Sequence, residues 1–260
     1  IAVGFSLVSM TILAVAATGE AQREAPGTPS VEPLRMMTER IRPLFSRMGK
    51  PKPGDWLESH PERGQTFAEY IRANPTRPSG KRKILYIQPI GEFSDKSREI
   101  VSRTAEFMGI YFDLPVKIRG DFPLSVVPDE ARRTHPAWGV KQVLSTYVLE
   151  DVMKPRLPED AAAYIAFTMF DLWPGEGWNY VFGQASLEDR VGVWSLFRNG
   201  KADGTPAEFR ECLLRTLKIA THETGHMFGM AHCTAYECNM CGCNNREESD
   251  RRIVELCPEC

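Results

Sequence analysis

Residues 222–232 decide the fold and the chemistry expected of this chain. They read His222-Glu223-Thr224-Gly225-His226-Met227-Phe228-Gly229-Met230-Ala231-His232. On a helix, His222 and His226 lie one turn apart on the same face, so both imidazoles can bind one cation. Glu223 is rotated away from that pair, so its carboxylate can act on a water without binding the metal. Gly229 allows the helix to end in a left-handed turn, and that turn lets His232 supply a third nitrogen.

The spacing of this motif favours a catalytic zinc site over a chance arrangement. A bare H-E-x-x-H can arise by chance on a polar helix, but here a glycine and a third histidine follow at fixed intervals. Three of the chain's five histidines fall within these eleven residues. Three imidazole ligands leave the fourth position of zinc open to water, as in catalytic sites. We therefore predict that His222, His226 and His232 bind a zinc ion and that Glu223 is the general base for zinc-activated water.

The residues after His232 extend the motif. Cys233 follows directly, Cys238 and Met240 come next, and Cys257-Pro258-Glu259-Cys260 closes the stretch. This series resembles the archaemetzincins, a metzincin-like family of zinc metalloproteases whose signature is H-E-x-x-H-x-x-G-x-x-H-C followed by Cys, Met and C-x-x-C. Residues 171–179 and 193–196 also look like the family. The resemblance covers about residues 80–260 and implies a zinc metallopeptidase with aminopeptidase-like cleavage.

The resemblance also implies roles for residues beyond the three histidines. Met240 would be a support beneath the zinc site and not a ligand. A closed, structural zinc site would be formed by the thiolates of Cys233, Cys238, Cys257 and Cys260. Cys241 and Cys243 are additional thiols, and either could replace Cys238. We therefore expect two Zn²⁺ ions per chain, one catalytic and one structural.

The distribution of the cysteines independently favours metal over disulfides. Six of the seven lie within residues 233–260. A disulfide framework is usually spread over a small chain, whereas a local cluster with C-x-x-C is typical of a zinc site. Residues 244–252 are polar and cannot build a core, so metal binding would stabilise this C-terminal segment.

Net charge says little about the partners, and one alternative function stays open. A formal net charge of -2 shows no basic excess, so we expect no nucleic acid as a partner. The resemblance implies a peptide or protein substrate. The alternative to a peptidase is a non-enzymatic zinc-binding structural or interaction module. The presence of Glu223 favours the enzyme. Tyr236 lies close in sequence, but we interpret it as a core or surface tyrosine and not as a proton donor.

The hydrophobic pattern predicts an α/β (α+β) fold. Strands are expected at 84–87, 116–119, 163–168, 179–185 and 191–197, and helices after Ser94, over 140–153 and after Thr205. Residues 120–138 are expected to form a loop. This order predicts a metzincin-like (zincin) fold, with a mixed, mainly parallel five-stranded sheet and packed helices. Thr205, Pro206 and Glu208 form a capping signal for the helix that carries the active-site histidines.

Three regions are expected along the chain. Residues 1–17 are apolar and signal-like, residues 18–80 form a Pro-rich linker with short helices near 36–49 and 66–73, and residues 81–260 form the catalytic domain. The first segment is short for a bilayer, so we predict no stable membrane span. If it is a signal peptide the protein is exported or periplasmic, and otherwise it is cytoplasmic.

Overall fold

The computed structural model describes residues 31–260 apart from residue 187, so the expected leader at 1–17 lies outside the described residues. The helices are α1 (Val31–Ile41), α2 (Trp56–Ser59), α3 (Phe67–Arg72), α4 (Asp95–Phe112), α5 (Ser145–Tyr147), α6 (Pro206–Met227) and α7 (Arg246–Arg251). The strands are β1 (Ile84–Ile90), β2 (Val116–Ile118), β3 (Arg132–Thr134), β4 (Lys141–Leu144), β5 (Ala161–Thr168), β6 (Asp171–Trp173), β7 (Gly183–Ala185) and β8 (Val191–Ser195). Within the described part of the chain, every helix is too short or too polar to span a bilayer.

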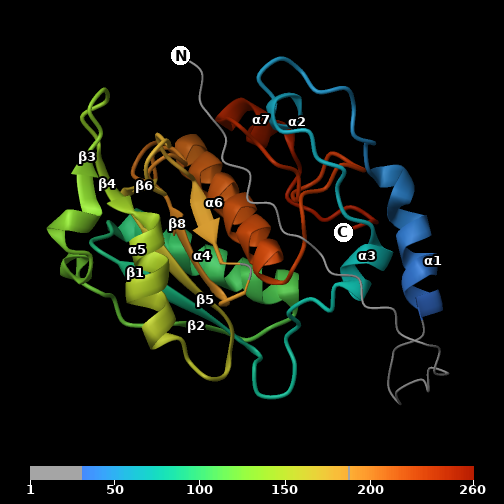
Figure 1. Cartoon of the computed structure of the whole chain (residues 1–260), viewed down its shortest axis with the longest axis horizontal. Helices are drawn as coiled ribbons and strands as arrows, with labels where there is room; N and C mark the ends of the chain where they lie inside the picture. Colours follow the sequence, from blue (N-terminus) through green and yellow to red (C-terminus); the bar gives the residue numbers. More distant parts are fainter. Residues whose placement is uncertain (1–30, 187) are drawn as a thin grey trace, which may run out of the picture.

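The centre of the molecule is a five-stranded sheet in the order β2-β1-β5-β8-β7 (Figure 1). Its first four strands are parallel, and only β7 runs antiparallel to its neighbour β8. This is the mixed, mainly parallel sheet that the sequence predicts. Strand β5 is buried at every position because helices cover both faces, which explains its unbroken apolar sequence.

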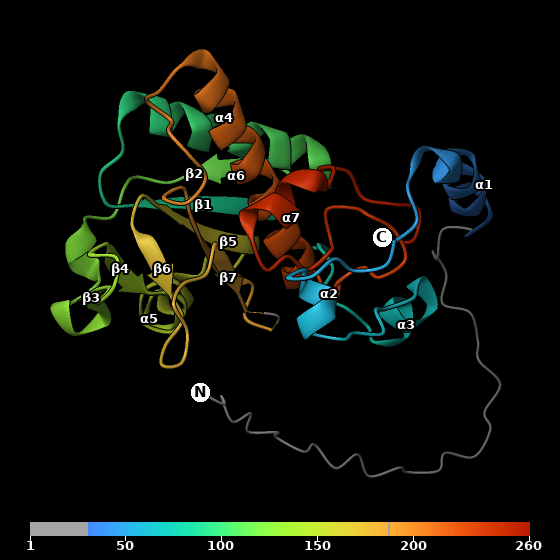
Figure 2. The same cartoon turned by 90° about the horizontal axis from the view of Figure 1, so that it is seen from above.

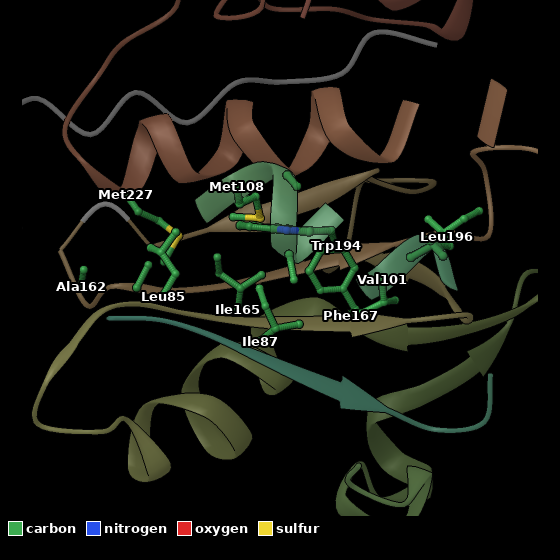
Figure 3. Close-up of a cluster of buried hydrophobic side chains, with 14 of the residues drawn as sticks. Leu85, Ile87, Val101, Met108, Ala162, Ile165, Phe167, Trp194, Leu196 and Met227 are labelled. Carbon is green, nitrogen blue, oxygen red and sulfur yellow. The ribbon is translucent and has the colours of Figure 1, made fainter. Parts of the chain in front are cut away.

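The larger part of the core lies between this sheet and helices α4 and α6. Leu85 and Ile87 of β1, Phe167 of β5 and Trp194 of β8 pack there against Met108 of α4 (Figure 3). A second cluster covers the opposite face, where α5 and the π-helical turn Val148–Met153 pack. Helix α6 is therefore seated on a rigid platform, which fixes the position of the histidines at its C-terminal end.

Local signals place both ends of α6. The Thr205 hydroxyl accepts a hydrogen bond from the Glu208 amide, and the Glu208 carboxylate accepts one from the Thr205 amide at 2.8 Å, so the predicted capping box is present. The helix ends at Met227, and Gly229 follows with φ +84°. The predicted left-handed turn after the second histidine is therefore confirmed.

The structure differs from the predictions in a second small sheet and in the bounds of several elements. Residues 141–144, expected within a helix, form β4, which pairs with β6 and β3 in a separate three-stranded sheet. Part of the expected loop 120–138 supplies β3 to that sheet. The strands expected at 179–185 and 191–197 shorten to 183–185 and 191–195, and the helix expected near 36–49 is α1, Val31–Ile41. Apolar periodicity could not reveal these partners because pairing depends on segments far apart in sequence.

The segment before β1 packs against the C-terminal segment, and both views place α2 and α3 beside it (Figure 2). The Met48 amide donates to the Ala235 carbonyl at 3.1 Å, and the Glu237 amide donates to the Ser46 carbonyl at 2.9 Å. The division at residue 80 between linker and catalytic domain stays a prediction. These contacts show that residues 46–48 are tied to the cysteine-rich stretch.

Candidate active site and metal centres

The three motif histidines converge at the C-terminal end of α6. His222 and His226 are one turn apart on the helix, and their Nε2 atoms are 3.0 Å from one another. The turn at Gly229 returns the chain, so that one ring nitrogen from each of His222, His226 and His232 lies within 4.8 Å of the others. The structure thus brings together all three predicted ligands.

The opposite nitrogen of each ring is held by a hydrogen-bond acceptor. His222 Nδ1 lies 2.7 Å from the Asn239 carbonyl oxygen, and His226 Nδ1 lies 2.6 Å from the Met230 carbonyl oxygen. His232 Nδ1 lies 3.0 Å from the Glu62 carboxylate. Carbonyl and carboxylate oxygens accept but do not donate, so each Nδ1 carries the proton and each Nε2 presents a lone pair.

This arrangement fits a cation. Burial, with the neighbouring His232, lowers the pKa of His222 to about 4, and burial, with His222, lowers that of His226 to about 4. Both rings are therefore neutral near pH 7, and two Nε2 lone pairs face one another without a proton between them. A shared zinc ion would turn this repulsion into coordination, because neutral imidazole nitrogens are preferred zinc ligands.

Glu62 is a site residue that sequence analysis missed. It lies in the expected linker, 170 residues before His232 in the sequence. Nothing in its local sequence marks it, because its role comes from the packing of residues 56–65 over the third histidine. Trp56 from the same segment lies against the His232 ring, with a centroid separation of 5.3 Å.

Replacing Glu62 with Ala is expected to weaken zinc binding at the histidine site by roughly 10–100-fold, because His232 loses the acceptor that orients its ring. Glu62→Gln keeps an acceptor oxygen and should fall between the parent and the alanine variant. The measurement is competition with a zinc chelator. Glu58→Ala is the control, since Glu58 accepts from the Gly54 amide and contacts no histidine of the site. Equal affinities for all four proteins would remove Glu62 from the site.

Two close contacts fix the backbone beside the histidines, at Gly225 and at Gly229. Met240 is fully buried, and its sulfur would lie 2.6 Å from a Cβ placed on Gly225, between the two helical histidines. The methionine therefore packs against α6 at Gly225, and its role as a support of the zinc site stays a prediction. At Gly229 a Cβ would meet the Pro75 Cβ at 2.8 Å, so both the positive φ and the close packing require glycine there.

Gly229→Ala is expected to lower both the free energy of unfolding and the affinity of the histidine site for zinc. The left-handed backbone alone costs about 1–2 kcal/mol for alanine, and the contact with Pro75 adds to this. Gly54→Ala is a matched control, because Gly54 has φ +86° but no atom within 4 Å of its added Cβ. Denaturant unfolding should show the larger loss at Gly229. Equal losses with unchanged zinc affinity would mean that the turn does not position His232.

Glu223 faces a cleft of about 530 Å³ together with the three histidines. Residues 177–185, including strand β7, form the opposite wall. The Glu223 side chain packs beneath β7, where its Cγ would be 3.3 Å from a Cβ on Gly183. Burial raises the pKa of Glu223, which makes its carboxylate a better proton acceptor. The cleft has room for an extended peptide next to this carboxylate.

Four cysteines form the second cluster. One sulfur from each of Cys233, Cys238, Cys257 and Cys260 lies within 4.8 Å of the others. The Cys233–Cys257 and Cys238–Cys260 sulfur separations are 3.7 and 3.8 Å. These distances are too long for disulfides, but they match a tetrahedron with Zn–S bonds of about 2.3 Å, whose sulfurs are about 3.7 Å apart. The donor set therefore fits a closed structural zinc site.

The remaining candidates near the motif lie outside both ligand sets. Cys241 accepts a hydrogen bond from the Cys238 amide at 3.3 Å and donates to the Tyr236 carbonyl at 3.1 Å, while Cys243 borders the cleft. Tyr236 is buried, and its hydroxyl accepts from Arg42 at 2.9 Å. It packs with the cysteines in a small core and does not line the cleft.

Comparison with known proteins agrees with this geometry. The model of Peptidase family M54 matches residues 168–260. Archaemetzincin-2 of Macaca fascicularis and that of Homo sapiens are each 34% identical over 261 residues, an alignment that covers 87% of this chain and 72% of the relative. Among solved structures, archaemetzincin from Methanopyrus kandleri has a TM-score of 0.55 and 27% identity, over 69% of this chain and 92% of that chain.

Proposed function

Because this chain belongs to the archaemetzincin family of zinc metallopeptidases, we propose that Glu223 is the general base of peptide-bond hydrolysis at a zinc held by His222, His226 and His232. The observation that carries this assignment is the pair of facing Nε2 atoms, 3.0 Å apart, whose rings are each fixed by an acceptor at Nδ1. Glu223 lies beside them in the same cleft.

The residues divide the reaction between them. His222, His226 and His232 would hold the zinc ion, which would supply an activated water and polarise a carbonyl oxygen. Glu223 accepts the proton of the attacking water and then donates it to the leaving amine. The acceptors at each Nδ1 keep the rings in one tautomer, and Met240 supports the helix beneath them.

The substrate is a peptide, and we place it along β7. This strand is the edge of the central sheet and lines the cleft opposite the histidines. An edge strand offers unpaired backbone groups to which an extended peptide can add as a further strand. Cleavage of aminopeptidase type is proposed from the family resemblance. An N-acetylated peptide distinguishes the two modes, since an aminopeptidase should leave it intact and an endopeptidase should cleave it.

The four-cysteine cluster is proposed to hold a second, structural zinc. It joins residues 233–238 to the chain end at 257–260 and lies in a small core that also includes Phe45 and Met48. Its closed donor set leaves no position for substrate.

The proposed function is tested by incubating a mixed peptide pool with zinc-loaded protein, with chelated protein and with protein reloaded after chelation. Hydrolysis should disappear with the chelator and return with zinc, because the activated water depends on the metal. A pool left intact by the loaded protein would contradict the proposal.

A further inference from the structure

A smaller cavity of about 90 Å³ lies beside Glu223. It adjoins the cleft, with which it shares the lining residues Phe182, His222, Glu223 and Cys243. The rest of its wall includes Lys218, which is one helical turn before His222 on α6, together with Arg246 and Arg252. Among the described residues, the lining of this cavity therefore contains three cationic side chains and one carboxylate, that of Glu223.

One of the three cations is balanced by carboxylates. Arg252 lies 3.2 Å from the Glu237 carboxylate and 3.6 Å from that of Glu248. Its charge is therefore largely compensated within the protein, although its buried Nε lacks a hydrogen-bond partner among the described residues. The other two cations, Lys218 and Arg246, are therefore the ones that can bind a ligand in the cavity.

Lys218 is a buried cation whose hydrogen-bond acceptors are backbone carbonyl groups. Its Nζ donates to the carbonyl oxygens of Ser249 at 3.0 Å and Asp250 at 3.3 Å. Among residues 31–186 and 188–260 it forms no ion pair, and its side chain is 5% exposed. Burial lowers the pKa of Lys218, because desolvation disfavours its charged form.

Arg246 is in a similar position. Its guanidinium donates to the Asn199 side-chain oxygen at 3.3 Å and to the Arg198 carbonyl, and it lies 4.6 Å from the centre of the Phe182 ring. No carboxylate of the described residues pairs with it. The charge of Asp250 acts on both Arg246 and Lys218, but that carboxylate accepts from Arg215 Nε at 2.9 Å. Two positive charges thus remain available at one small cavity.

We propose that this cavity is a carboxylate-binding subsite of the peptidase, and the proposal rests on the function proposed above. Because the cavity lies next to Glu223, the substrate group that enters it would be within about one residue of the scissile bond. The volume of the cavity suits a short side chain and excludes a large aromatic ring. The carboxylate has two possible sources: an Asp or Glu side chain beside the cleaved bond, or the free C-terminus of a short peptide. Arg246 and Lys218 would bind it through charge-assisted hydrogen bonds.

A purely structural role for these cations makes a different prediction. Lys218 holds carbonyl groups in the last part of α7, Arg246–Arg251, and so also fixes that helix on α6. If the cations only join the two helices, the charge of the substrate should not alter cleavage. The two roles are therefore separated by changing the substrate and not only the protein.

The test starts with the zinc-loaded full chain and a pool of natural-sequence peptides, whose cleavage sites are read by mass spectrometry. Three matched peptides are then made. Two have Asp or Asn at the position beside the cleaved bond and an amidated C-terminus. The third has Asn at that position and a free C-terminal carboxylate. The parent should cleave a carboxylate-bearing peptide at least about ten-fold more efficiently in kcat/KM than the amidated Asn peptide. Preference for Asp identifies the side chain as the ligand, and preference for the free terminus identifies the chain end.

Variants assign that preference to the cavity. Arg246→Gln should clearly lower the ratio of kcat/KM between carboxylate and amide peptides, with Lys218 as the remaining cation, and Arg246→Lys should retain more of it than Arg246→Gln. Arg210→Gln, an exposed arginine of α6 outside the cavity, should leave the ratio unchanged. As a readout without turnover, the Glu223→Gln protein should bind the preferred peptide at least about ten-fold more tightly than its uncharged match.

The outcomes separate this proposal from the proposed function. If the peptide pool is not cleaved at all, the peptidase assignment fails and the subsite fails with it. If peptides are cleaved and bound without regard to charge, hydrolysis stands and the subsite is overturned. A preference that is undiminished in Arg246→Gln would also overturn it, because Arg246 would then not bind the carboxylate.

Discussion

Glu223→Gln is expected to lower kcat for peptide hydrolysis by at least about a hundred-fold while zinc remains bound. The substitution keeps the size of the side chain, which matters because Glu223 packs beneath Gly183. It removes the proton acceptor that the mechanism needs. The ligands His222, His226 and His232 are untouched, so zinc affinity should change little. The measurement is steady-state hydrolysis of a cleaved peptide, with zinc content determined on the same protein samples.

A second glutamate of the same helix provides the control. Glu211 is about half exposed and pairs with Arg215 at 2.6 Å, and its replacement by Gln should leave both hydrolysis and zinc content close to the parent. Full activity in Glu223→Gln would exclude this residue as the general base. Loss of zinc from Glu223→Gln would instead indicate that the carboxylate supports the metal.

Cys257→Ser is expected to destabilise the C-terminal segment strongly. Cys257 is buried with Cys233, Tyr236 and Met240 in a small core. Structural zinc contributes on the order of 10 kcal/mol in small zinc domains, so the loss of one thiolate should lower the thermal midpoint by roughly 10 °C. Activity should also fall, because the Asn239 carbonyl in this segment holds the His222 ring and Met240 packs against Gly225 of the same helix.

Limited proteolysis gives a local readout of the same change. Cleavage of Cys257→Ser should begin within residues 233–260, while the central sheet stays protected longer. Cys243→Ser is the matched control, since Cys243 lies outside the four-sulfur set and its loss should leave the protease pattern unchanged. Equal protection of Cys257→Ser and the parent would show that the cluster does not stabilise this segment.

The parts of the fold that follow local rules could be predicted from the sequence. The capping box at Thr205 and the glycine turn at Gly229 are short-range features, and both appear where expected. The apolar runs of β1, β5 and β8 predict buried parallel strands. Their spacing alone predicts that the three histidines share one site, because helix geometry places the first two on one face and the turn at Gly229 brings the third beside them.

The parts that depend on distant contacts could not be predicted in the same way. Gln142 to Leu144 of β4 pair with Asp171 to Trp173 of β6, so a stretch expected to be helical is a strand. Glu62 reaches His232 only because an N-terminal segment folds over the active site. Likewise, Lys218 and Arg246 come from separate helices and meet at one cavity. Each case needs the tertiary structure, since no periodicity joins the residues involved.

The most direct test is the number of zinc ions bound per chain, measured by elemental analysis on the full chain, His226→Ala and Cys257→Ser. We expect two zinc ions in the parent and one in each variant, with hydrolysis abolished in His226→Ala. Retention of the parent zinc content in His226→Ala, with zinc lost only from Cys257→Ser, would contradict this expectation. The histidine cluster would then hold no metal, and the proposed mechanism would have no catalytic centre.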